Sequence, residues 1–180
     1  MLMEVVGFHG TYYYKAEKII REKHFTYTKR PDHWLGWGIY FYINDFSAAD
    51  LWVKRSSKYR NAKNPKPKVG VLKNTIKVDE KNLLDLDSRD GLQILEDFIK
   101  EIENAKLKVV LSDESKNVNT CQIINLLDDD IHVVKRTFSE NPKVKAKYAK
   151  SINNCFDVVQ TQQLCIRDMS IFNYETLSIC

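Results

Sequence analysis

The sequence predicts one α+β domain that covers residues 1–180, and three observations lead to this fold class. Hydrophobic residues make up 43% of the 180 residues, and a domain of this size buries about 70% of the surface that its unfolded chain exposes. Strand-like segments lie at both ends of the chain with helical segments between them, which is not the regular alternation that builds a parallel sheet. The chain also contains no internal repeat and no low-complexity tract.

The N-terminal third alternates between strand and helix patterns. Residues 5–8 form a short apolar strand, and residues 14–22 place apolar side chains at helical spacing opposite lysine and glutamate. A loop then leads into an aromatic and β-branched strand at 38–43. Ser47 is the expected N-cap of a helix over 47–55.

The rest of the chain begins with a break at 60–68, which is rich in Lys, Asn and Pro. Its clearest element is an amphipathic helix over 91–105. The remaining expected elements are strands at 69–78, 83–86, 156–159 and 164–167 and helices at 119–127 and 144–151.

Charge and cysteine content narrow the class of protein. The net charge of +4 is mildly basic and compatible with a polyanionic partner. The N-terminus lacks the basic and apolar regions of a signal peptide, and no run approaches the about 18 apolar residues of a membrane helix. We therefore expect a cytoplasmic protein that does not contact a membrane.

The cysteines form no CxxC pair and no ligand spacing with the four histidines, so we expect reduced thiols and no metal at Cys121, Cys155, Cys165 and Cys180.

The segment Phe8-His9-Gly10-Thr11 carries the first chemical signal. His9 ends an apolar strand, where a histidine is either a core residue or a functional one. Gly10 lets a planar ligand lie against the backbone and use its N–H and C=O groups. Thr11 adds a hydroxyl at the same point.

The segment 36–41, Gly-Trp-Gly-Ile-Tyr-Phe, carries the second signal. Its glycine pair lacks the GxGxxG spacing and does not open a helix, so a dinucleotide-binding phosphate loop is not expected. Tyr40 follows Gly38 on a strand and can present its ring face for stacking. Trp52 could stack in the same way or pack in the core. Together the two segments predict a slot for a flat ring, and nicotinamide is the best candidate.

These segments, with the Ala-Ala-x-x-Trp helix that follows them, resemble the N-terminal half of the ADP-ribosyltransferase fold of the poly(ADP-ribose) polymerase and diphtheria-toxin type. The resemblance implies a split β-sheet core with flanking helices and an enzyme that consumes NAD, without a metal. It implies that His9 binds the NAD ribose, that Gly10 clamps the nicotinamide and that Tyr40 stacks on it. The further NAD-binding residues expected are Thr11, Gly38, Ser47 and Trp52.

The third catalytic residue of that family is a glutamate that opens a late strand, and here Gln163 precedes Leu-Cys-Ile. This ending also resembles a bacterial family of ADP-ribosyltransferase-like domains with glutamine at that point. Gln162 is the alternative if the register shifts by one, and a polar turn is the other interpretation. A glutamine can hydrogen-bond the ribose but cannot take a proton from the acceptor. We therefore expect one transfer per acceptor, with Asp157 or Asp168 as candidate bases.

The expected function is mono-ADP-ribosylation of a macromolecule, with RNA or DNA as candidate acceptors. Such a chain would suit a toxin or antiviral defence effector that a neutralising antitoxin protein controls. Alternatives are a protein-directed transferase, an NAD glycohydrolase, and an inactive module that binds NAD or ADP-ribose. Two basic stretches could bind nucleic acid or the NAD pyrophosphate, or form solvated surface; they comprise Lys54, Arg55, Lys58, Arg60, Lys63, Lys66 and Lys68, with Tyr59 interleaved, and Lys143, Lys145, Lys147 and Lys150.

Overall fold

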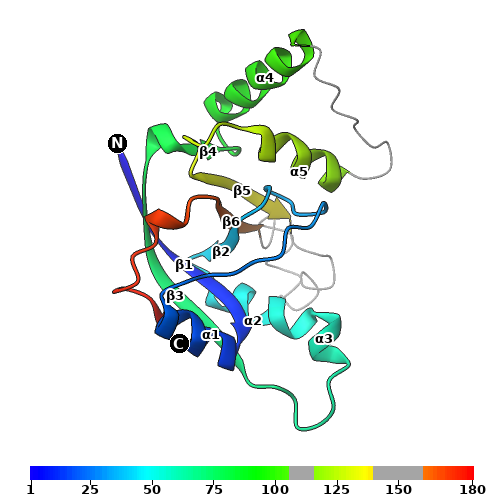
Figure 1. Cartoon of the computed structure of the whole chain (residues 1–180), viewed down its shortest axis with the longest axis vertical. Helices are drawn as coiled ribbons and strands as arrows, with labels where there is room; N and C mark the ends of the chain where they lie inside the picture. The colour runs from blue at the N-terminus through cyan, green and yellow to red at the C-terminus, as the bar shows by residue number, and fades with distance from the viewer. Residues whose placement is uncertain (106–115, 140–159) are drawn as a thin grey trace, which may run out of the picture.

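The computed structural model describes residues 1–105, 116–139 and 160–180 (Figure 1). These residues form a mixed α+β fold around one seven-stranded sheet with the strand order β4-β5-β6-β2-β1-β3-β7. Neighbouring strands are antiparallel, apart from the parallel pair β4 and β5. The α+β class predicted from the sequence is confirmed. The strands are β1 (Leu2–Tyr12), β2 (Ile39–Ile43), β3 (Val69–Asp79), β4 (Leu83–Asp85), β5 (Val133–Ser139), β6 (Gln160–Ile166) and β7 (Ser178–Ile179).

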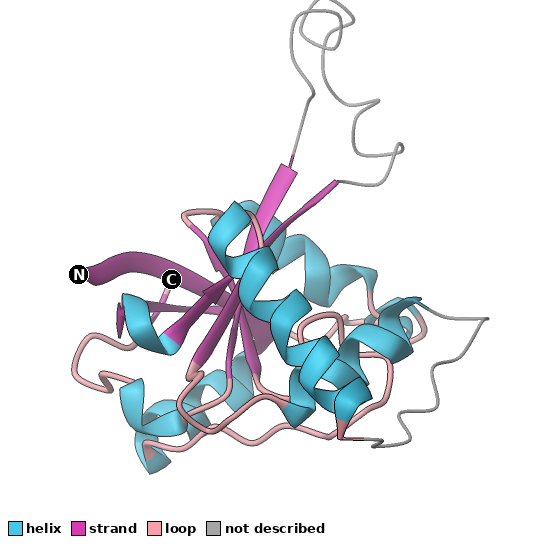
Figure 2. Cartoon of the chain, turned by 90° about the horizontal axis from the view of Figure 1, so that it is seen from above, coloured by secondary structure: helices cyan, strands magenta, loops and turns pink. Residues whose placement is uncertain are grey.

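Helices and short 3₁₀ turns connect the strands and lie on both faces of the sheet (Figure 2). None of the helices in the described part of the chain has the length and apolar character that a membrane crossing requires. The helical elements are α1 (Tyr13–Glu22), α2 (Phe46–Arg55), α3 (Ser57–Arg60), η1 (Glu80–Asn82), α4 (Arg89–Asn104), α5 (Lys116–Leu126) and η2 (Met169–Ile171).

The start of α2 differs from the sequence prediction. Asp45, not Ser47, is the N-cap, because the Asp45 carboxylate accepts a 2.8 Å hydrogen bond from the Ala48 N–H. Ser47 lies exposed in the first turn of the helix. Aspartate caps a helix as well as serine does, so residue type alone did not separate the two positions.

Several strands differ from the sequence prediction. β6 begins at Gln160, whereas the predicted strand covered 164–167, so Gln162 and Gln163 lie within the strand and not in a turn before it. The short strand β7 was not predicted. β1 covers 11 residues because β3 pairs with it along its whole length. β5 was not predicted, because its middle residues Lys135, Arg136 and Thr137 hide the apolar pattern of a strand. These polar residues still form a strand because β5 pairs with both β4 and β6. The helix expected at 144–151 and the strand at 156–159 lie outside the described residues.

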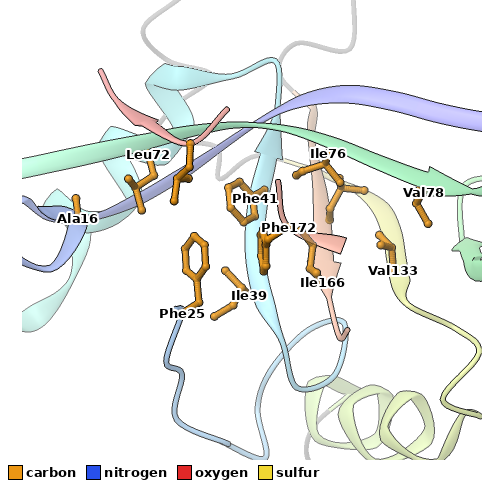
Figure 3. Packing of buried hydrophobic residues seen from close by; sticks show 12 residues of the cluster. Ala16, Phe25, Ile39, Phe41, Leu72, Ile76, Val78, Val133, Ile166 and Phe172 are labelled. Carbon is orange, nitrogen blue, oxygen red and sulfur yellow. The ribbon is translucent and has the colours of Figure 1, made fainter. Parts of the chain in front are cut away.

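The sheet separates the two larger of three hydrophobic clusters in the described residues, and the third, with Tyr42, Ala49 and Val71, lies between α2 and the sheet. One of the two larger clusters lies beneath α1 and the C-terminal segment, where the rings of Phe41 and Phe172 lie 5.7 Å apart (Figure 3). The other lies beneath α4 and α5 and includes Leu84, Ile124 and Val134. Both faces of the sheet are therefore covered by packed side chains, which fixes the register of the central strands.

Candidate functional site

β1 and β2 separate after two residue pairs, the second of which is Phe8–Tyr42. By contrast, β1 pairs with β3 along its whole length. In this antiparallel register the next hydrogen-bonded pair after Phe8–Tyr42 would join Gly10 to Tyr40. That pair is not formed, so the sheet is split at this point.

The His9 side chain takes the place of the missing backbone pair. Its Nδ1 donates a hydrogen bond of 2.8 Å to the Tyr40 carbonyl. The ring packs against Phe25 and Phe41, with centroid distances of 5.8 and 5.5 Å. His9 therefore holds the two strands apart, and its Nε2 is left as the second polar atom of the ring.

The split exposes the backbone of Gly10. The Val6 carbonyl accepts a 2.9 Å hydrogen bond from the Asn44 N–H, which shows that Val6 directs its backbone groups toward β2. Because the direction alternates along a strand, Gly10, four residues later, directs its N–H and C=O the same way. β2 has already diverged there, so it does not pair with these two groups.

A cavity of about 520 Å³ occupies the split, within the usual size range of small-molecule sites. Six predicted site residues and the candidate stacking residue Trp52 line it. Its walls come from β1, α1, β2, α2, β6 and the loop before β2. The predicted lining residues are His9, Gly10, Thr11, Gly38, Tyr40, Trp52 and Gln163.

The reason for a glycine at position 10 differs from the expected one. A Cβ on Gly10 would lie 1.9 Å from the Ala49 carbonyl oxygen and 2.8 Å from Val53 Cγ2. The missing side chain thus makes room for α2, rather than for a ligand. The backbone groups of Gly10 still line the cavity.

The Tyr40 side chain is fixed by the turn before β2. Its hydroxyl donates to the Gly36 carbonyl at 2.8 Å and accepts from the Leu35 N–H at 2.7 Å. Gly36 has a φ of 79°, a conformation that glycine adopts most readily. Burial raises the pKa of the Tyr40 hydroxyl, so this group stays protonated. Tyr40 therefore offers its ring, and not its hydroxyl, to the cavity.

Gln163 and Gln162 have opposite placements on β6. Gln163 is 4% exposed, pairs across the sheet with Tyr42 and lines the cavity. Within the described residues its side-chain amide makes no hydrogen bond, so it is free to bind a ligand. Gln162 is exposed on the other face, opposite Thr137. The structure therefore brings Gln163, and not Gln162, to the other predicted residues.

Two histidines in the cavity are neutral at physiological pH. Burial lowers the pKa of His9 below its ordinary value of 6.5, and the charge of Lys15 acts in the same direction. Burial also lowers the pKa of His33, with a further contribution from Arg30. The His33 ring lies 5.6 Å from the Tyr40 ring, edge to face. A neutral His9 whose Nδ1 carries the proton presents Nε2 as a hydrogen-bond acceptor.

Sequence reasoning missed several lining residues. Lys15 and Arg30 bring positive charge to the cavity, and Arg30 also pairs with Asp32 at 3.4 Å. His33 and Trp34 lie in the loop before β2. The concentration of aromatic and imidazole side chains in that loop was the available signal, but a loop carries no periodicity from which their direction could be derived.

Two predicted functional residues are not at the cavity. Ser47 and Asp168 are absent from its lining. The Asp168 carboxylate accepts hydrogen bonds from the Ser170 N–H and hydroxyl at 2.8 and 2.7 Å, and it lies 3.6 Å from His132. Asp168 thus stabilises the turn after β6. Asp157 lies outside the described residues.

Four lysines of the first basic stretch interact with neighbouring groups of the protein. Lys66 donates to the carbonyls of Tyr59, Arg60 and Ala62, which closes the end of α3. Lys54 forms an ion pair with Asp50. The ammonium groups of two further lysines lie over tyrosine rings, Lys58 over Tyr12 and Lys68 over Tyr13. The second stretch, with Lys143, Lys145, Lys147 and Lys150, lies outside the described residues.

No group of three or more His, Cys, Asp or Glu side chains in the described ranges is placed to hold a metal ion. Cys165 is buried beside the Gly36 carbonyl, and burial raises its pKa to about 12, so it is not a reactive thiolate. Cys121 is also buried and Cys180 is exposed.

Comparison with curated proteins identifies an uncharacterized archaeal relative. The chain is 31% identical over 103 residues to the uncharacterized protein MJ0359 of Methanocaldococcus jannaschii. The match covers 57% of this chain and 46% of that protein, so it spans about half of the relative's length. No family model and no solved structure matches the chain.

Proposed function

We propose that this protein is an NAD-dependent mono-ADP-ribosyltransferase. The observation that carries the proposal is the His9–Tyr40 hydrogen bond, which holds β1 and β2 apart and leaves the Gly10 backbone facing the cavity. The same cavity contains the Tyr40 ring and the Gln163 amide. These are the groups that the resemblance to ADP-ribosyltransferases requires in one place.

The exposed backbone of Gly10 suits a carboxamide. A carboxamide carries one carbonyl acceptor and one NH₂ donor, and Gly10 presents one N–H donor and one C=O acceptor on the same side of β1. Nicotinamide bound there would stack on the Tyr40 ring, which the turn at Leu35 and Gly36 holds in place. Stacking and two hydrogen bonds together fix the plane of the ring.

The remaining parts of NAD find matching groups in the cavity. The His9 Nε2 acts as acceptor for a ribose hydroxyl, and Gln163 hydrogen-bonds the nicotinamide ribose. Lys15 and Arg30 supply the positive charge that the pyrophosphate needs. This assignment gives each of these polar residues one role in NAD binding.

The reaction breaks the bond between ribose C1′ and the nicotinamide nitrogen. The electron pair of that bond leaves with nicotinamide, which departs neutral, while positive charge develops on the ribose. The acceptor nucleophile forms the new bond to C1′ and releases its proton to solvent. The protein accelerates the step by holding nicotinamide and ribose in a reactive geometry. Because Gln163 is neutral, the site favours a single transfer to an already nucleophilic acceptor over chain extension.

The first test is release of free nicotinamide from NAD in the presence of RNA, DNA or cell extract. We expect release by the native protein, with a loss of about a hundredfold in His9→Ala. His24→Ala is the matched control, because His24 is exposed and does not line the cavity. Gln163→Ala and Gln162→Ala form a second pair, in which only Gln163→Ala should lose activity.

The outcomes separate the candidate activities. ADP-ribose attached to a nucleic acid supports the proposal, attachment to protein indicates a protein-directed enzyme, and free ADP-ribose indicates an NAD glycohydrolase. Binding of NAD in calorimetry without nicotinamide release with any acceptor indicates an inactive binding module. Within the same proposal the chain acts as a toxin or defence effector, so its expression should arrest growth and His9→Ala should relieve the arrest.

A further inference from the structure

Three aromatic side chains from separate elements meet beside the cavity. Trp34 lies 5.6 Å from Trp52 and 5.2 Å from Phe138, measured between ring centroids. Trp34 comes from the loop before β2, Trp52 from α2 and Phe138 from β5. Both tryptophans line the cavity, and the Trp52 residue is 46% exposed. We call Trp34, Trp52 and Phe138 the aromatic ledge.

The ledge adjoins the Gln163 side of the cavity. In the β5–β6 register Arg136 is directly opposite Gln163, and Phe138 is two residues further along β5. Residues paired across a sheet, and residues two apart in one strand, share a face. The exposed Arg136 guanidinium lies 6.0 Å from the Phe138 ring centroid. No carboxylate in the described ranges forms an ion pair with Arg136.

We propose that the aromatic ledge and Arg136 bind the acceptor, and that this acceptor is an unpaired base of a single-stranded nucleic acid. The proposal rests on the function above, because it places the acceptor where it can reach ribose C1′ past Gln163. Exposed tryptophan faces stack on any base, and an adjacent arginine binds the phosphate that follows it. A base paired within a duplex cannot present its face in this way.

Packing alone does not account for the ledge. A tryptophan whose role is to fill the core would be largely buried, whereas Trp52 keeps nearly half of its surface in contact with solvent. The planes of the Trp34 and Trp52 rings meet at 83°, so the two rings are not stacked on each other. The combination of an exposed tryptophan and an arginine that pairs with no carboxylate among the described residues favours a nucleotide over an acidic or purely apolar ligand.

The test measures binding of single-stranded RNA without NAD, so it does not depend on turnover. The chain has three tryptophans, and Trp37→Phe leaves the two ledge tryptophans as the only source of tryptophan fluorescence. Trp37 is not part of the cavity lining. We expect single-stranded oligoadenylate and oligouridylate to quench the fluorescence of this variant. The affinity measured from quenching should be at least about tenfold weaker for the duplex that the two strands form.

Substitutions then assign the binding to the ledge. We expect Trp52→Ala, in the Trp37→Phe background, to weaken oligonucleotide binding about tenfold and Trp52→Phe to restore most of it. Arg136→Ala should weaken binding and reduce its salt dependence. Lys77→Ala is the matched control, because Lys77 lies on β3 and pairs with Glu4 at 3.0 Å.

Two kinds of outcome would contradict the binding of nucleic acid by the aromatic ledge. If Trp52→Ala weakens NAD binding in calorimetry and leaves oligonucleotide binding unchanged, the ledge holds the adenine of NAD. If no oligonucleotide quenches the fluorescence, or if Lys77→Ala has the same effect as Arg136→Ala, the ledge does not bind nucleic acid specifically. Ledge-dependent binding of RNA without nicotinamide release would uphold this inference and overturn the proposed function instead.

Discussion

The Nδ1 atom of His9 donates a 2.8 Å hydrogen bond to the main-chain carbonyl of Tyr40, at the point where β1 and β2 stop pairing. In a continuous ladder this carbonyl would accept the N–H of Gly10. One side chain therefore replaces a backbone hydrogen bond and leaves the backbone groups of Gly10 facing a cavity. Several measurable consequences depend on this relationship.

Gly10→Ala should reduce stability even without NAD. Its Cβ would lie 1.9 Å from the Ala49 carbonyl oxygen, so α2 must shift, at a cost of about 1–3 kcal/mol in the free energy of unfolding. Urea denaturation measures this difference. Gly70→Ala is the control, because its nearest neighbour would lie at 3.1 Å and it should cost clearly less. Equal stabilities of the two variants would show that α2 does not require the glycine.

Tyr40→Phe should lower the stability of the protein without weakening the binding of nicotinamide. The change removes the hydroxyl that pairs with the Leu35 N–H and the Gly36 carbonyl, and it should cost about 1–3 kcal/mol of stability. The ring remains, so the dissociation constant for nicotinamide should change little. Tyr40→Ala should weaken nicotinamide binding strongly. Calorimetry on both variants checks the difference, and a large loss of affinity in Tyr40→Phe would contradict a stacking role.

The pKa of His9 predicts how activity and stability depend on pH. Burial lowers this pKa, so the folded protein resists a proton that the unfolded chain accepts near pH 6.5. The free energy of unfolding should therefore decrease as the pH falls below 6.5 and stay level above about pH 7. Nicotinamide release by the folded protein should fall only at lower pH, below the lowered pKa of His9, because protonated Nε2 can no longer accept a hydrogen bond from ribose.

His33, whose pKa is also lowered, contributes to the same pH dependence. Comparison of denaturation at several pH values for the native protein, His9→Ala and His33→Ala separates the two contributions. Each variant should show a smaller loss of stability in acid than the native protein. If the loss of stability in acid is unchanged in both variants, other titratable groups cause it.

Gln163→Glu should increase nicotinamide release, because a carboxylate stabilises the positive charge that develops on the ribose. We expect a rate increase of about tenfold. The same change buries a carboxylate at a 4% exposed position, so it should reduce stability more at pH 8 than at pH 5. Gln162→Glu, on the exposed face, should change neither quantity. A Gln163→Glu enzyme that releases nicotinamide no faster would argue against contact between this residue and the ribose.

Local patterns were sufficient for much of the fold. The apolar spacing in α1 and α4 and the aromatic pattern of β2 predicted these elements within a few residues. β5 was missed because its polar centre is stabilised by two neighbouring strands, which a local pattern does not show. The choice between Asp45 and Ser47 as N-cap likewise depended on where α2 begins.

The candidate site was predictable where residue type determines chemistry. His9, Gly10, Tyr40 and Gln163 all line one cavity, as the motifs indicated. The split itself was not predictable from the residues, because it depends on the register of β1 and β2 and on one side-chain hydrogen bond. Trp34, in the loop before β2, was missed for the same reason, since only the folded chain brings it beside Trp52.

Mass spectrometry of RNA, DNA and protein after incubation with isotopically labelled NAD shows whether the protein transfers ADP-ribose, and to which class of acceptor. We expect one ADP-ribose added to single-stranded nucleic acid, together with an equal amount of free nicotinamide. The product should disappear in His9→Ala and persist in His24→Ala. No labelled macromolecule and no free nicotinamide with any acceptor, from a protein shown to be folded, would contradict the proposed function.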